Sequence, residues 1–161
     1  MGRSFALPAT LGSLRNYVDG EFVETGRTFD NVSPIDGSVL AKVHEADAAL
    51  VDRAVRAARR ALDEGPWGRT RVEQRAEALH RVADIIARRF DEFLQAEVAD
   101  TGRPVEQARK LDVYRGIANF RSFADLGKTA HGEFYETHLP DGSELINCTK
   151  RKPLGVVASI S

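Results

Sequence analysis

Near its carboxyl end the chain reads Arg151-Lys152-Pro153-Leu154-Gly155-Val156-Val157-Ala158-Ser159-Ile160-Ser161. From Leu154 onward this stretch is almost entirely apolar. It lacks the alternation of apolar and polar residues that is typical of a strand with one solvent-exposed face. Such a run is typical of a parallel strand that is covered on both faces. It predicts a strand over residues 153–161 and, with the helical patterns before it, an α/β fold class.

A longer and more polar hairpin is expected just before this strand. Its arms span residues 132–139 and 144–151, and Pro140-Asp141-Gly142 supplies the turn. Both arms carry more polar than apolar residues, so the hairpin cannot bury a core of its own and needs a partner sheet. Residues 128–152 are therefore predicted to be a bridging and oligomerisation element.

Three amphipathic helices are predicted between residues 47 and 127. Asp47 is the expected N-cap of the first, which Gly65-Pro66 ends. Its apolar stripe comprises Leu50, Val51, Ala54, Val55, Ala58, Ala61 and Leu62.

The second helix is expected to be the longest element of the chain. Thr70 and Glu73 have the spacing of a capping box, and one apolar face continues from there to Gly102 without interruption. The third helix begins at Pro104, where the missing amide donor does no harm, and continues to Gly127.

Two small antiparallel hairpins are predicted at the amino end. The first spans residues 16–23 around Asp19-Gly20, a dipeptide that tolerates the positive φ of a tight turn. The second pairs residues 28–32 with residues 38–43 around a turn at 33–37. Residues 1–15 show no pattern and are expected to be an irregular extension.

Composition excludes several classes of partner. The 161 residues contain 23 basic and 24 acidic side chains, so the formal net charge of -1 gives no field that would attract nucleic acid or an anionic membrane. No apolar stretch is long enough for a membrane span. Small molecules and protein surfaces are the expected partners.

Cys148 is the single cysteine, which excludes an intramolecular disulfide and favours a reducing, cytoplasmic location. A reactive thiol needs a base, a cation or a helix N-terminus to depress its pKa, whereas Cys148 alternates within a polar strand, so it is interpreted as an ordinary strand residue rather than a nucleophile. The four histidines lack the paired spacing of metal ligands and are interpreted as surface residues, so no metal site is expected.

Four stretches together resemble the N-terminal portion of the aldehyde dehydrogenase superfamily. They are residues 16–22, 33–37, 99–104 and 151–161, and their order and spacing carry the resemblance. The resemblance implies small antiparallel hairpins, three helices, an oligomerisation-type hairpin and the first strand of a Rossmann-like sheet. Residues 16–127 then form the N-terminal part of the NAD-binding domain, and residues 153–161 its first strand.

Within that superfamily, residues 111–125, 43–47 and 139–142 resemble 2-hydroxymuconic and 2-aminomuconic semialdehyde dehydrogenases. In those relatives the arginine that matches Arg115 helps to hold the substrate carboxylate, a role that suits the paired donors of a guanidinium group. The relatives usually have proline where Tyr114 stands, which affects the expected direction of Arg115. A surface or interdomain ion pair is the alternative role for Arg115, and another semialdehyde or betaine-type dehydrogenase is the alternative assignment.

The resemblance also implies cofactor-binding residues. Ile160 and Ser161 match positions that lie beside NAD in family members, with NADP as an open alternative. The oxyanion-binding asparagine, the ribose-binding lysine, the general-base glutamate and the nucleophilic cysteine all lie downstream of the matching positions in the family. No catalytic residue is therefore assigned among residues 1–161, and we expect this polypeptide alone to oxidise no aldehyde.

Two functional hypotheses follow. The chain is either the N-terminal part of an NAD-dependent dehydrogenase for a small-molecule semialdehyde, homo-oligomeric through the 132–151 hairpin, or a non-catalytic truncated homologue that acts as an association domain. Under either hypothesis, the hairpin and terminal strand leave apolar surface and strand edges open. We expect partial disorder or aggregation after about Leu126.

Overall fold

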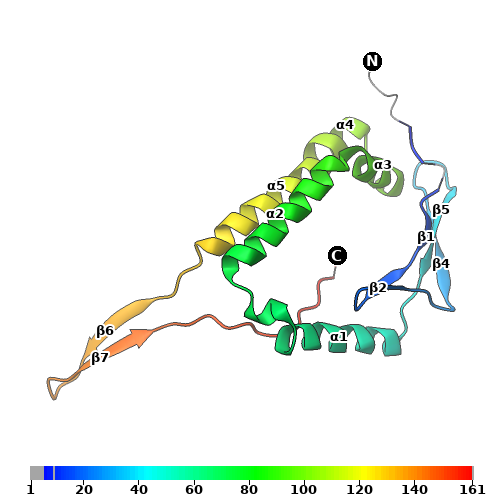
Figure 1. Ribbon diagram of the computed structural model, residues 1–161. Coiled ribbons are helices and arrows are strands. Elements are labelled where there is room, and N and C mark those ends of the chain that lie inside the picture. The colour runs from blue at the N-terminus through cyan, green and yellow to red at the C-terminus, as the bar shows by residue number, and fades with distance from the viewer. Residues whose placement is uncertain (1–5, 9, 161) are drawn as a thin grey trace.

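The computed structural model describes residues 6–8 and 10–160, which form a mixed arrangement of helices and small sheets (Figure 1). The helices α2 and α5 lie side by side, and the hairpin β6–β7 projects away from them as an arm. The last residues return toward α1, where Gly155 approaches the guanidinium of Arg59. Among the described residues, no helix is long and apolar enough to cross a membrane.

The first predicted hairpin is confirmed. Strand β2 (Asn16–Val18) pairs antiparallel with β3 (Glu21–Val23). The two turn residues both have positive φ, 56° at Asp19 and 85° at Gly20. This is the backbone that a two-residue hairpin with right-handed strand twist requires.

The second predicted hairpin is also confirmed, and the structure adds a strand to it. Strand β4 (Thr28–Val32) pairs antiparallel with β5 (Val39–His44), with an irregularity between Asn31 and Val32. Strand β1 (Gly12–Leu14) pairs parallel with β5, giving the order β1-β5-β4. The prediction that residues 1–15 are irregular is therefore wrong at β1, because a three-residue strand has too few side chains to show a pattern.

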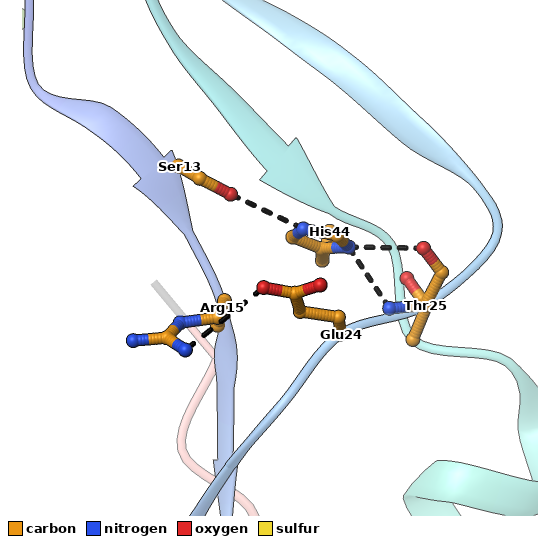
Figure 2. A network of polar contacts seen from close by, with 5 residues as sticks. All are labelled: Ser13, Arg15, Glu24, Thr25 and His44. Carbon is orange, nitrogen blue, oxygen red and sulfur yellow. Dashed lines mark hydrogen bonds and ion pairs between the residues drawn. The ribbon is translucent and has the colours of Figure 1, made fainter.

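One histidine joins three parts of this β structure, as Figure 2 shows. His44 Nε2 lies 3.2 Å from Ser13 Oγ on β1, and the backbone N–H of Thr25 donates to His44 Nδ1 at 2.9 Å. Arg15 and Glu24 form an ion pair beside it at 3.9 Å. The interpretation of His44 as a surface residue is wrong, since its half-buried ring cross-links β1, the β3–β4 connection and β5.

Helix α1 (Ala48–Asp63) begins where the sequence predicts. Asp47 Oδ1 accepts a hydrogen bond from the Leu50 N–H at 2.8 Å, so the N-cap is confirmed. The predicted apolar stripe of α1 is buried only in part, because Leu50 is buried while Val51 and Val55 are about half exposed. One side of α1 is therefore only partly covered by the described residues.

The prediction of one uninterrupted helix up to Gly102 is wrong. The structure has α2 (Val72–Arg88) and α3 (Phe90–Thr101), separated at Arg89, whose ψ of 24° is not helical. The Arg89 side chain bonds Glu92 in the first turn of α3 at 2.8 Å. The break lets Leu94 of α3 turn back into the core that α2 lines. Gly102 ends α3 in the left-handed conformation as predicted, with φ of 68°.

The predicted capping box of α2 is wrong as well. A short 3₁₀ helix (Pro66–Arg69) precedes α2, and Thr70 Oγ1 donates to its Pro66 carbonyl at 2.8 Å. The helix starts one residue later than expected, and the Arg71 N–H donates to Gln74 Oε1 at 3.2 Å. The capping interaction between a residue and the side chain three positions later is therefore present, but at Arg71 and Gln74 instead of Thr70 and Glu73.

The third predicted helix is confirmed in extent but not in regularity. It consists of α4 (Val105–Gln107), a π-helical turn (Ala108–Val113) and α5 (Tyr114–Lys128). Ala108 and Val113 are both buried in one core cluster with Ala83, Leu94, Val98 and Ile117. Residues five apart lie about 140° apart on a regular α-helix, so the wider π-turn is what lets both face the same core.

The polar hairpin is confirmed, with shorter arms than predicted. Strand β6 (Phe134–His138) pairs antiparallel with β7 (Glu144–Cys148). The strand predicted over residues 153–161 is not formed in the described range up to residue 160, and Leu154 is 97% exposed. A strand needs a hydrogen-bonded neighbour, and the described residues provide none for this segment.

The π-turn makes a prediction about proline. Tyr114 is exposed, stands first in α5, and donates its N–H only to Leu111, so Tyr114→Pro should cost about 1 kcal/mol, the net value of one hydrogen bond. Ser122→Pro, at an exposed site inside α5, should cost about 3 kcal/mol or more. Urea unfolding of both variants, followed by circular dichroism, measures the difference. Equal losses would contradict the role of the wide turn.

Candidate functional site on the outer face of α5

Helix α5 presents one side to the core and the other to solvent. Ile117 and Ala124 are buried, and Ile117 shares the core cluster with Ala83 of α2. Ala124 follows Arg115 by nine residues, which is about half a turn around the helix axis. Arg115 is therefore exposed on the side of α5 opposite α2. Within residues 6–8 and 10–160 its guanidinium forms no ion pair, so its five donors remain available.

An ion pair fixes the chain just before Arg115. Arg103 Nη1 lies 2.8 Å from Asp112 Oδ1 and connects the segment after α3 to the π-turn. Asp112 is half-buried, and its second oxygen, Oδ2, is buried with no hydrogen-bond partner in the described part of the chain. Arg115 follows Asp112 by one turn, so this anchored turn determines where its backbone lies.

A groove of about 320 Å³ opens between α2 and α5, starting at Gly116, the residue that follows Arg115. Leu79 of α2 and Gly116, Asn119, Phe120 and Phe123 of α5 line it. Phe123 is 63% exposed, although it is a large apolar side chain. A Cβ at Gly116 would meet nothing within 4 Å, so the groove is open next to Arg115. Asn119 is the one lining residue with a hydrogen-bonding side chain.

Ion pairs hold α2 and α5 together away from Arg115. Arg121 Nη2 lies 2.9 Å from Asp84 Oδ1, and His80 Nε2 lies 3.0 Å from Asp125 Oδ1. Asp125 has a pKa below its usual value. The main cause is its hydrogen bond with the Lys128 side chain, followed by its hydrogen bond with the His80 side chain. Arg121 and Lys128 are engaged by acidic partners, so Arg115 is chemically different from them.

The two predicted cofactor residues are not part of a formed site in the described structure. Ile160 is 95% exposed, and Ser161 lies outside the described residues. The segment from Leu154 to Ile160 has open apolar side chains and no neighbouring strand in the described range. The residues present therefore do not form a dinucleotide site by themselves. An apolar extended segment of this kind is nevertheless typical of a strand in a dinucleotide-binding sheet.

The other candidate groups stay apart. Cys148 is exposed on β7, opposite Phe134, and the described residues place no base beside it. No group of three or more histidine, cysteine or acidic side chains in the described ranges could hold a metal ion.

Arg115 was assigned from the family resemblance, whereas the groove that begins at Gly116 was not predicted from the sequence. The i,i+4 spacing of Arg115 and Asn119 places them on one helix face, and Gly116 next to Arg115 leaves space there. These signals are present in the sequence. They gain meaning only once the buried side of α5 is known, since that side decides which residues stay open.

The chain matches the family model described as "Aldehyde dehydrogenase family" over residues 22–161. It is 55% identical over 147 residues to 2-aminomuconic 6-semialdehyde dehydrogenase of a Pseudomonas species, covering 91% of this chain and 30% of that protein. It is 53% identical over 150 residues to 2-hydroxymuconic semialdehyde dehydrogenase of Pseudomonas sp. strain CF600, covering 92% and 31%. The chain thus spans about 30% of the length of these curated relatives.

Solved structures agree with the sequence match. An NAD+ complex of aldehyde dehydrogenase from Bacillus cereus superposes with a TM-score of 0.74 at 33% identity, over 76% of this chain and 26% of that one. Gamma-glutamyl-gamma-aminobutyraldehyde dehydrogenase of Burkholderia cenocepacia gives 0.73 at 38% identity, over 76% and 25%. The α/β fold class is confirmed by these neighbours, and the chain belongs to the aldehyde dehydrogenase family.

Proposed function

We propose that this chain is the N-terminal part of an NAD-dependent aldehyde dehydrogenase that oxidises a carboxylated semialdehyde of the 2-hydroxymuconic type to the acid. The observation that carries the proposal is the 55% identity to 2-aminomuconic 6-semialdehyde dehydrogenase over 91% of the chain. Such identity over one continuous stretch supports a shared substrate class as well as a shared fold.

Arg115 is the proposed substrate-binding residue. A carboxylate needs a cation that is accessible and not already neutralised, and guanidinium can offer two parallel donors to its two oxygens. Arg115 is exposed and has no acidic partner among the described residues, whereas Arg121 on the same helix is paired with Asp84. The alternative role, a surface ion pair, has no partner in the described range to support it.

NAD is the proposed cofactor, with Ile160 and Ser161 beside it. Support comes from family membership and from the relative of known structure in complex with NAD+. NAD, when bound, would supply the hydride-accepting chemistry that the oxidation of an aldehyde needs. Because the described residues form no dinucleotide site on their own, the cofactor-binding sheet must be completed by further strands, and the 161-residue polypeptide alone is expected to oxidise no aldehyde.

The hairpin β6–β7 is the proposed site of homo-oligomerisation. Every residue of its two strands is exposed except Asn147, and neither strand has a second neighbour in the described structure. Open edges of this kind favour the addition of another strand. We also place the protein in the cytoplasm, which the single exposed cysteine supports.

A chimera tests the proposed function. In it, this chain replaces the matching part of the Pseudomonas 2-aminomuconic 6-semialdehyde dehydrogenase. We expect the chimera to reduce NAD with 2-hydroxymuconic semialdehyde, since more than half of the exchanged residues are identical. The chain alone, assayed in parallel, should show no activity. A folded chimera without activity would contradict the proposal and favour the non-catalytic alternative.

Arg115→Ala in the active chimera tests the carboxylate contact. Loss of a hydrogen-bonded ion partner should lower kcat/KM for the carboxylated semialdehyde by about 10-fold or more, mainly through KM. Hexanal, which has no carboxylate, should be affected much less. Arg121→Ala is the matched control, because it removes an equal charge from α5 on the side paired with Asp84. Similar effects of the two substitutions on both substrates would refute a specific role for Arg115.

The free energy of unfolding of the 161-residue chain shows whether Arg115 is a binding residue or a structural one. Arg115→Ala should change the free energy of unfolding by less than about 0.5 kcal/mol, because Arg115 is exposed and unpaired within the described range. Arg103→Ala should cost about 1 kcal/mol, since it leaves the half-buried Asp112 without its partner. Thermal unfolding measures both, and a larger loss for Arg115→Ala would show that its role is structural.

A further inference from the structure

Asn119 stands at a chemical boundary on α5. It is exposed, follows Arg115 by four residues, and so lies one helical turn away on the same face. Side chains at this spacing have Cβ atoms about 5–6 Å apart, a distance over which two groups can contact one small ligand. Beyond Asn119 the groove is lined by Leu79, Phe120 and Phe123, which have no polar atoms in their side chains.

The arrangement orders three surfaces along the helix face. A free cation at Arg115 comes first, then the amide of Asn119, and then the apolar walls of the groove. Gly116 has no side chain to separate them, and a Cβ there would meet nothing within 4 Å. A molecule with a carboxylate at one end and a carbon chain behind it has the same order of chemistry.

We propose that Asn119 is a second substrate-binding residue, whose amide N–H donates to the substrate carboxylate held by Arg115, while the Leu79–Phe120–Phe123 groove takes the carbon chain. This inference rests on the proposed function and adds to it a residue that selects for carboxylated substrates. A neutral amide can hydrogen-bond to a carboxylate without offering a full charge, so Asn119 contributes direction and Arg115 contributes charge.

An alternative role for Asn119 is that of an ordinary polar residue that keeps the outer face of α5 soluble. In that case an isosteric change would have little effect on any substrate, because exposed positions tolerate substitution. The two roles differ most clearly for Asn119→Asp, which keeps the size of the side chain but replaces its donor with a negative charge.

The experiment uses the chimera described above and compares KM and kcat for 2-hydroxymuconic semialdehyde and hexanal. Asn119→Asp should raise KM for the carboxylated substrate by about 100-fold, because like charges then face each other. Asn119→Leu should raise it by about 10-fold through loss of one hydrogen bond to a charged group. In both variants the KM for hexanal, whose chain would also lie in the groove that Asn119 lines, should rise much less than the KM for the carboxylated substrate.

Ser122→Asp is the matched control, since it adds the same charge to an exposed site on α5 that does not line the groove. If Asn119→Asp and Ser122→Asp change KM for the carboxylated substrate equally, the inference is wrong while the proposed function stands. If both Asn119 variants raise the KM for hexanal as much as the KM for the carboxylated substrate, Asn119 shapes the groove and does not bind the carboxylate. An inactive parent chimera would overturn the proposed function and this inference together.

Discussion

The packing of Ile117 on α5 against Ala83 on α2 determines which side of α5 remains open. Val113 shares that cluster, and the π-turn that runs from Ala108 to Val113 lets Ala108 join it without rotating α5 away from α2. Close packing allows few rotations of a helix about its axis, so this contact turns Arg115 outward. The position of Asn119 and the groove beside it follow from the same rotation. The core therefore acts indirectly on the proposed binding face, because it decides which side of α5 stays exposed.

The open surfaces of the molecule have a common physical character. Leu154, Val157 and Ile160 are 77–97% exposed, β6 and β7 have free edges, and one side of α1 is only partly covered in the described structure. Exposed apolar patches and strand edges are costly in water and usually mark contacts with other segments or subunits. The chain spans about 30% of the length of its curated relatives.

Local signals in the sequence were reliable where one or two residues decide the backbone. Asp19-Gly20 fixed a hairpin turn, Asp47 an N-cap and Gly102 a helix end. Prediction failed where tertiary packing decides. Nothing in the apolar pattern marks the break at Arg89 or the π-turn, because both serve contacts between helices. The 153–161 strand was expected from its composition, yet its formation requires neighbouring strands. The role of Arg115 came from resemblance, whereas Asn119 required the structure.

The central claim is the proposal that this chain is the N-terminal part of a dehydrogenase, in which further strands or subunits would cover its open faces. Hydrogen exchange at the amides of Val156 to Ile160, compared between the 161-residue chain and the chimera, tests it most directly. The account predicts rapid exchange in the chain alone, where the segment has no strand neighbour in the described structure, and strong protection in the chimera. Equal protection in the two proteins would mean that the segment completes its structure without further strands, and would contradict the claim.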